Sequence, residues 1–142
     1  GQLTLSGNLT LLNTSTTLIE LGGASQGVSY DFLSVGGAGT LAGNLHLTFL
    51  NNFQANVPTT TTFTVLTAGA GLSGAFANIA PGQRLMAFDG AGSFQVNYGV
   101  GSLFAPGSVV LSNFIVTVPE PSTYALLGLG LALLSYSMRR RR

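Results

Sequence analysis

The feature that most restricts the fold of this chain is a period-two alternation of apolar and polar residues within residues 1–118. In the segment Asn44-Leu-His-Leu-Thr-Phe49, for example, every second residue is apolar. Successive side chains of a strand point to opposite faces of a sheet, so this pattern predicts half-buried strands. The same alternation occurs at residues 2–5, 8–11, 28–32, 62–65, 94–98 and 108–111.

Glycine-containing turn signals separate these runs, among them Gly36-Gly37, Asp89-Gly90 and Pro106-Gly107. Thr, Val and Phe, which favour strands, fill the runs themselves. No stretch of 12 residues in this region has the apolar spacing of an amphipathic helix. We therefore expect residues 1–117 to form an all-β domain.

A short repeat narrows the choice among all-β folds. It reads Gly1-Gln-Leu-Thr-Leu5, Gly7-Asn-Leu-Thr-Leu11 and Gly43-Asn-Leu-His-Leu47. The first two copies, six residues apart, indicate either tight coils or a hairpin, unless they are a chance echo. Coils with stacked apolar rows are how β-solenoids bury their core. We expect the end or cap of a β-solenoid, with an antiparallel β-sandwich as the alternative, because regularly spaced short strands suit both.

Charge is scarce, at 6% of residues against about 25% in an average soluble domain. Residues 1–118 contain Glu20, Asp31, Arg84 and Asp89, with a net charge of −2. The body therefore lacks the basic face that nucleic-acid binding requires. The absence of Cys excludes disulfides and Cys-based metal sites, and the absence of Lys excludes Schiff-base chemistry. A hydrophobic content of 46% argues against disorder.

Few side chains of the body could carry chemistry. His46 lies on the polar side of its alternation and is expected at the surface. Asp31 could be a calcium ligand or an acid, but a hydrogen bond to backbone at a strand end is the simpler interpretation. Arg84 could pair with Asp31 or Asp89, and Glu20 stands alone. We expect no catalytic, cofactor-binding or metal site, and a protein that is not an enzyme.

Carbohydrate binding is a separate possibility, because exposed aromatic rings can hold sugars. The candidates for such a row are Tyr30, Phe53 and Tyr98. The chain has nine Phe, four Tyr and no Trp, a balance that favours packing in the core instead.

Residues 118–142 follow a different pattern. Pro119-Glu120-Pro121 is followed by an uncharged segment that runs to Met138 and then by four consecutive arginines. Residues 121–138 lie at the lower edge of the roughly 20 residues that a membrane-spanning helix needs. We expect a hydrophobic, membrane-spanning helix over about 122–138, with the basic end 139–142 cytoplasmic and the body on the opposite side.

This ordered set resembles the PEP-CTERM sorting signal of Gram-negative bacteria. Val118 before the triplet and Ser122-Thr123 after it also resemble that family. The resemblance implies recognition by exosortase, a membrane-embedded, transpeptidase-like protease that processes exported proteins. It assigns the sorting motif to Pro119, Glu120 and Pro121, and the stop-transfer cluster to Arg139, Arg140, Arg141 and Arg142.

Residues 30–45 and Gly74-Ala-Phe76 also resemble the last coils of bacterial passenger-type β-solenoids, domains that often precede such a tail. Because the chain starts with Gly1 and enters a strand at once, we expect it to be the C-terminal part of a longer exported protein. The parent protein's activity could then reside upstream.

We therefore expect an exported, non-enzymatic structural or adhesive protein of the cell surface or extracellular matrix. The alternatives are a carbohydrate-binding module and the C-terminal fragment of a larger exported enzyme. The expected partners are exosortase, the lipid bilayer before processing, and exopolysaccharide or a second copy of the chain. We expect inner-membrane anchoring before processing and a surface or extracellular location afterwards.

Overall fold

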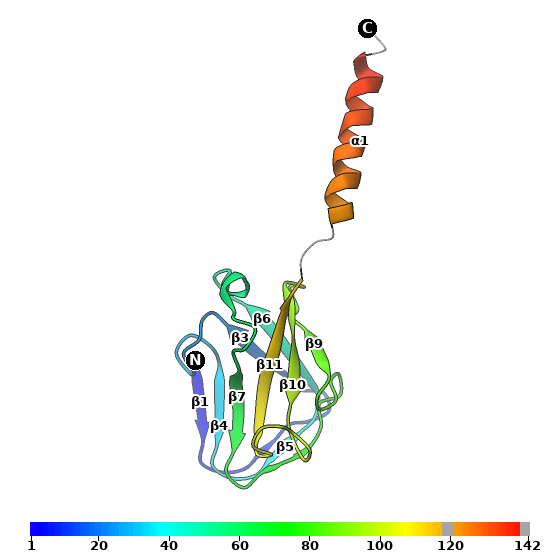
Figure 1. Ribbon diagram of the computed structural model, residues 1–142. Helices are drawn as coiled ribbons and strands as arrows, with labels where there is room; N and C mark the ends of the chain where they lie inside the picture. The colour runs from blue at the N-terminus through cyan, green and yellow to red at the C-terminus, as the bar shows by residue number, and fades with distance from the viewer. Residues whose placement is uncertain (118–120, 140–142) are drawn as a thin grey trace.

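The computed structural model describes residues 1–117 and 121–139. In the described part of the chain the body is built from strands, which confirms the all-β prediction, and α1 (Pro121–Arg139) is a separate helix (Figure 1). A short 3-10 turn, η1 (Phe53–Asn56), interrupts the strands. The strands are β1 (Gln2–Leu5), β2 (Leu9–Thr10), β3 (Thr16–Leu21), β4 (Phe32–Val35), β5 (Gly39–Leu41), β6 (Asn44–Phe49), β7 (Phe63–Ala68), β8 (Leu72–Gly74), β9 (Arg84–Met86), β10 (Gly92–Asn97) and β11 (Ser108–Val116).

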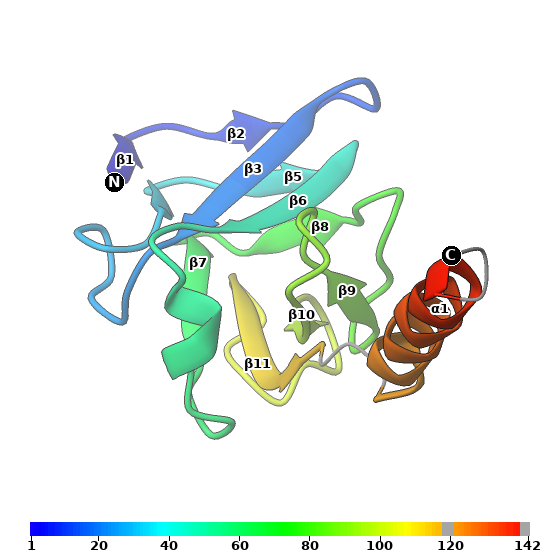
Figure 2. The same cartoon turned by 90° about the horizontal axis from the view of Figure 1, so that it is seen from above.

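Strands β1 to β8 pair in three parallel ladders, β1-β4-β7, β2-β5-β8 and β3-β6. In the first ladder Gln2 lies opposite Phe32, 30 residues further along the chain. In the third ladder Thr16 lies opposite Asn44. Consecutive strands therefore belong to different sheets, and the chain returns to the same ladder one circuit later (Figure 2). We call each circuit a coil; the first comprises β1, β2 and β3.

This arrangement distinguishes between the two structural interpretations of the short repeat. The two copies at residues 1–5 and 7–11 form β1 and β2, which belong to different sheets. The hairpin interpretation is therefore wrong, because a hairpin would pair the two strands with each other. The copies are consecutive sides of one coil, and their leucines point toward a shared interior.

Two glycines are required where successive coils come close. Gly43 has φ +66°, in the left-handed region, and a Cβ there would collide with the carbonyl oxygen of Ser15. A Cβ on Gly69 would lie 2.6 Å from the carbonyl oxygen of Gly36 in the preceding coil. Glycine is the residue that tolerates both situations without strain.

Beyond β7 the sheet changes direction. β7 pairs antiparallel with β11, β11 with β10, and β10 with β9. Between the pairs Ser93–Ile115 and Gln95–Ser112, two residues of β11 lie opposite one residue of β10, which is a β-bulge. Asn113, with φ 50°, supplies the left-handed backbone at this bulge. The antiparallel strands therefore extend the first ladder and cover the far edge of β7.

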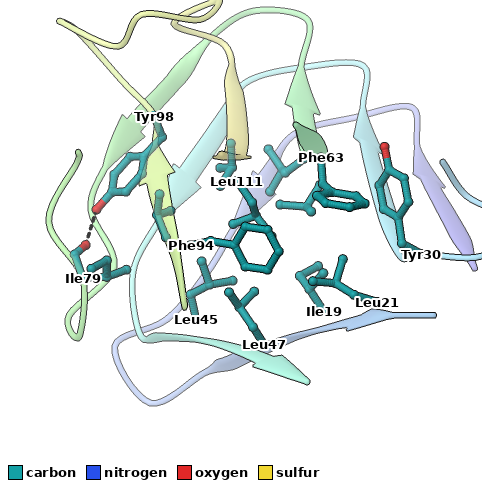
Figure 3. Packing of buried hydrophobic residues seen from close by; sticks show 14 of the residues in the cluster. Ile19, Leu21, Tyr30, Leu45, Leu47, Phe63, Ile79, Phe94, Tyr98 and Leu111 are labelled. Atoms are coloured by element: carbon teal, nitrogen blue, oxygen red, sulfur yellow. Dashed lines mark hydrogen bonds between the residues drawn. The ribbon is translucent and has the colours of Figure 1, made fainter. Parts of the chain in front are cut away.

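The inward faces of the ladders and of the antiparallel strands meet in one core (Figure 3). Phe94 is completely buried, and its ring centroid lies 4.8 Å from that of Phe114 and 5.7 Å from that of Phe63. The side chains buried most fully come from every part of the body: Leu21, Leu41, Leu45, Leu47, Phe63, Val65, Phe94, Val96, Tyr98, Val109 and Leu111.

One predicted strand is absent. Residues 28–32 form a loop up to the start of β4 at Phe32, and Val28 is 83% exposed. The N–H groups of Val28, Ser29 and Tyr30 all approach the carbonyl oxygen of Ser25, so a local turn takes the hydrogen bonds that a strand would need. The alternation here reflects a tight turn that buries Tyr30.

Helix α1 forms close to the predicted bounds of 122–138 and projects away from the body (Figure 1). Its leucines are exposed, with Leu126 at 78% and Leu129 at 66%. Among the described residues, none of the helices combines the length and the apolar character needed to span a membrane. The expected transmembrane helix is therefore not supported. Hydroxyl-bearing residues flank the apolar run Ala125–Leu134, whose ten residues are about half of what a span needs.

Candidate functional site

Asp31 serves the backbone. Its Oδ2 accepts a hydrogen bond from the N–H of Glu20 at 3.0 Å, and its Oδ1 lies 2.5 Å from the amino nitrogen of Gly1. The N–H of Asp31 in turn donates to the carbonyl oxygen of Glu20. The carboxylate thus joins β3 to the loop that leads into β4. The expected hydrogen bond to backbone is present, and its partner lies 11 residues away in sequence rather than in the adjacent turn.

Asp89 closes a turn and also reaches a neighbouring strand. Its Oδ1 accepts a hydrogen bond from the N–H of Ala91 at 3.0 Å, and Gly90 has φ 70°. Its Oδ2 lies 3.3 Å from the N–H of Phe49 at the outer edge of β6. The predicted Asp-Gly turn is therefore confirmed, and the carboxylate has a structural role in it.

Arg84 does not pair with Asp31 or Asp89, so that expectation is wrong. Its guanidinium donates instead to the carbonyl oxygens of Ser93 and Asn113, each at 2.7 Å, and to Ser93 Oγ at 3.2 Å. These acceptors lie on both sides of the β-bulge. The guanidinium has several donors in one plane and can therefore bond to acceptors from both strands at once.

His46 lies on the outer side of β6, as predicted, half-buried between core residues that point the other way. Its ring stacks on that of Phe88, with centroids 5.9 Å apart and planes inclined by 23°. Within the described residues no group of three His, Cys, Asp or Glu side chains gathers to hold a metal ion.

The three aromatic candidates for sugar binding do not form an exposed row. Tyr30 is 6% exposed, and its ring meets Phe63 edge-on at 5.1 Å. Phe53 also packs edge-on with the Phe63 ring, with centroids 6.0 Å apart. Tyr98 is 1% exposed, and its hydroxyl donates to the carbonyl oxygen of Ile79 at 2.5 Å (Figure 3). The carbohydrate-binding interpretation therefore loses the residues on which it depended.

The Tyr98 hydroxyl gives a prediction about pH. Burial raises the pKa of Tyr98 above the ordinary value of 10.0. As the pH rises through 10, tyrosines of the unfolded chain ionise first, so stability is complete below that pH and is lost as the pH rises toward the folded-state pKa. We expect Tyr98→Phe to cost about 1 kcal/mol at neutral pH and to make stability less sensitive to alkali. Urea denaturation over a pH series measures both effects; equal alkaline sensitivity in the two proteins would contradict the assignment.

An apolar groove at the exposed end of the first coil is a feature that the sequence reasoning missed. It has a volume of about 530 Å³ and is lined by residues of all three strands of that coil. Leu3 at its wall is 59% exposed and Leu18 is 51% exposed. The doubled Gly-x-Leu-x-Leu repeat could have indicated this groove. It places leucines on consecutive sides of the first coil, whose outer end is exposed.

Strand pairing and hydrogen bonds join the chain to the body up to the start of the C-terminal segment. Val116, at the end of β11, still lies opposite Gly92 in β10. The N–H of Thr117 then donates to the carbonyl oxygen of Ala91 at 3.1 Å, and its Oγ1 lies 3.6 Å from Met86 Sδ. The segment therefore leaves the body from a fixed point beside β9 and β10.

The predicted motif residues fall at and beyond the limits of the described chain. Pro121 and Arg139 are the first and last residues of α1. Proline at the first helical position is favoured, since its missing N–H has no partner to lose there. Pro119, Glu120, Arg140, Arg141 and Arg142 lie outside the described residues.

The described β body is followed by a short leucine-rich helix and, in the sequence, by a basic end. A family model, described as the PEP-CTERM protein-sorting motif, matches residues 117–142. The predicted PEP-CTERM signal is thereby confirmed. Comparison with curated proteins and with solved structures found no match for the chain.

The motif has consequences for the handling of the whole protein. It implies that the protein is exported, anchored at the membrane before processing, and sorted through exosortase. The match begins at Thr117, and among the described residues this is the last one whose N–H bonds to a backbone carbonyl of the β body.

Proposed function

We propose that this protein is a non-enzymatic structural or adhesive component of the cell surface or extracellular matrix, delivered there after removal of its sorting tail. The observation that carries the proposal is the direct junction between the sorting motif and a body in which three of the four charged side chains bond to the protein's own backbone. Asp31, Arg84 and Asp89 all spend their polar atoms on main-chain or turn hydrogen bonds. The outer faces of the ladders carry mostly uncharged Thr, Ser and Asn.

We further infer that β1 to β8 are the last coils of a β-solenoid and that β9 to β11 close its end. The constant return of the chain to the same ladder supports this inference, since parallel in-register strands stack one coil on the next. Leu9 and Gly39 pair in one coil junction, and Gly39 and Leu72 pair in the next. A sandwich would instead need antiparallel neighbours in both sheets.

A low surface charge suits a self-associating or matrix role. Net charge far from zero keeps proteins apart, and residues 1–118 have a net charge of −2. Partners such as exopolysaccharide or a second copy are therefore compatible with the body, and the membrane contact is confined to the stage before processing.

The test compares strains that lack the gene, express the wild-type chain, or express the double variant Glu20→Gln, His46→Gln. Within the part of the chain that the structure describes, neither the Glu20 carboxylate nor the His46 imidazole makes a hydrogen bond or an ion pair. We expect loss of the gene to weaken surface adhesion or matrix cohesion, and the double variant to restore it as fully as wild type. Unchanged cohesion without the gene, or failure of a normally exported double variant, would contradict the proposal.

The two alternatives are tested separately. A glycan array probed with the body would show binding if the protein were a carbohydrate-binding module in spite of its buried aromatic rings. If the native protein had hydrolase or transferase activity, and if residues before Gly1 carried that activity, the chain would instead be part of an exported enzyme. We expect neither result.

A further inference from the structure

The strands of the first coil each present a free edge on the same side of the molecule. In β1 the carbonyl groups of Gly1 and Leu5 accept hydrogen bonds from residues at the start and end of β4. Along a strand, consecutive residues direct their backbone groups to opposite sides. Gln2 and Thr4 therefore turn their N–H and C=O groups away from β4, toward an edge on which no strand of residues 1–117 lies.

The other two strands of this coil also direct the backbone groups of alternate residues toward the free edge. The N–H groups of Leu9 and Leu11 bond to the carbonyls of Ala38 and Thr40, so Thr10 between them faces outward. In β3 the carbonyls of Ser15 and Leu21 face β6, so even-numbered residues face outward. One of these outward residues, Glu20, is covered by Asp31, which leaves Thr16 and Leu18. The three edges lie at the ends of three parallel ladders.

Between these edges lies the apolar groove. Leu3, Leu5, Leu9, Leu11 and Ile19 line it, and its volume of about 530 Å³ has room for several side chains. In the next coil the equivalent interior is filled, with Leu41, Leu45 and Leu47 at 2% exposure or less. The groove therefore corresponds to the filled interior of the next coil, except that no further layer of side chains packs on it.

At the opposite end of the stack, two of the three far strand edges, those of β7 and β6, are covered. β11 pairs with the far edge of β7. At β6 the side chain of Asn78 takes the place of a strand: its Oδ1 accepts from the N–H of Leu45 at 2.9 Å, and its Nδ2 donates to the Leu45 carbonyl oxygen at 2.8 Å. The N–H of Phe88 bonds to the Leu47 carbonyl oxygen of the same edge at 2.7 Å. Exposed strand edges promote unwanted pairing, so natural folds cover them, as this one does at one end.

We propose that the free edges of β1, β2 and β3, with the groove between them, are the docking surface for one further parallel β coil, contributed by polypeptide that precedes Gly1. The added coil places a strand on each of the three edges and apolar side chains in the groove. This inference rests on the coil architecture proposed above, but not on the protein's role at the surface.

A coil of the same polypeptide fits this surface better than a second copy does. The ladders are parallel, so a second copy could continue them only with the far edges of its own stack. Two of those far edges are already taken, by β11 and by the side chain of Asn78. A preceding coil meets no such obstacle, because its chain would enter β1 at Gly1 as Asp31 enters β4, one step before the paired residues Gln2 and Phe32.

Hydrogen exchange measured by NMR tests the proposal on two samples, the 142-residue chain and the protein purified from its native host. The amides of Thr4, Thr10 and Leu18 report on the free edges. The amide of Leu11, already bonded to the Thr40 carbonyl oxygen, is the matched control in the neighbouring position. We expect the native protein to extend before Gly1, and its edge amides to exchange at least ~100-fold more slowly than in the 142-residue chain, with Leu11 slow in both.

Three results would overturn the proposal. The native polypeptide could begin at Gly1, or it could extend further while the edge amides exchange equally fast in both samples. Protection that appears in the 142-residue chain and grows with protein concentration would identify a second copy as the occupant. None of these measurements depends on adhesion or matrix cohesion, so a failure here is distinct from a failure of the proposed function.

Discussion

Replacing both prolines of the sorting triplet, Pro119→Ala together with Pro121→Ala, is expected to block removal of the tail. Proline in general restricts its own φ to about −65° and disfavours helix at the residue before it, and we infer that exosortase recognises this restriction in the triplet. Alanine is the strongest helix former, and the double substitution lets the triplet join α1. We expect the processed fraction to fall about tenfold or more, which corresponds to about 1.4 kcal/mol of lost recognition.

The measurement is an immunoblot of cell-associated and released protein from the native host. Ser135→Ala is the matched control, since it changes α1 outside the triplet and removes only a hydrogen bond from Ser135 Oγ to the Leu131 carbonyl oxygen of the same helix. The control should be processed like wild type. Normal processing of the double-proline variant would show that the triplet does not carry the signal.

Phe94→Ala is the substitution expected to damage the body most. Phe94 is completely buried and contacts the rings of Phe49, Phe63 and Phe114, which come from three other strands. Truncation removes the ring at the point where the antiparallel strands pack on the coils and leaves a cavity. Large-to-small changes of this kind cost about 3–5 kcal/mol, a large share of a small domain's stability.

Phe88→Ala is the control for this loss, because the same residue type is 82% exposed at position 88. Its ring contributes little beyond the stack on His46, so we expect a change within about 0.5 kcal/mol. Urea denaturation of the full chain measures both variants. Equal losses for the two substitutions would mean that the core is not centred on Phe94.

Much of the strand content could be predicted from the sequence, because alternation is a direct consequence of strand geometry. Residues 44–49 show why: their side chains alternate between the core and the surface along β6. The short strands β5, β8 and β9, of three residues each, could not be predicted. A run of three residues contains too little alternation to distinguish a strand from a loop, and these strands exist because ladder neighbours hold them.

The prediction of polar contacts was less successful, because contacts depend on tertiary position. Arg84 could be expected near a carboxylate on grounds of charge, but it donates instead to the carbonyl oxygens of Ser93 and Asn113 at the β-bulge. Tyr98 could be expected at the surface for its hydroxyl, but the Ile79 carbonyl oxygen satisfies that group inside the core. In both cases the partner is a backbone group, which carries no signal in the sequence.

The sorting tail is the opposite case. Its elements are contiguous and ordered, so Pro119-Glu120-Pro121 and the four arginines could be recognised without any tertiary contact. The structure adds the position of the junction between body and tail, because Thr117 still bonds to the body and the motif begins at this residue. It does not support the expected membrane span, since hydroxyl-bearing residues flank the apolar part of α1 at both ends.

The PEP-CTERM motif implies that exosortase processes this protein at its C-terminal segment. The intact mass of the mature protein from the native host, with and without a functional exosortase, tests this directly. We predict that the mature protein lacks Arg139–Arg142 and most of α1, and that loss of exosortase restores the full C-terminal mass. A mature protein that still ends in Arg142 when exosortase is active would contradict the claim.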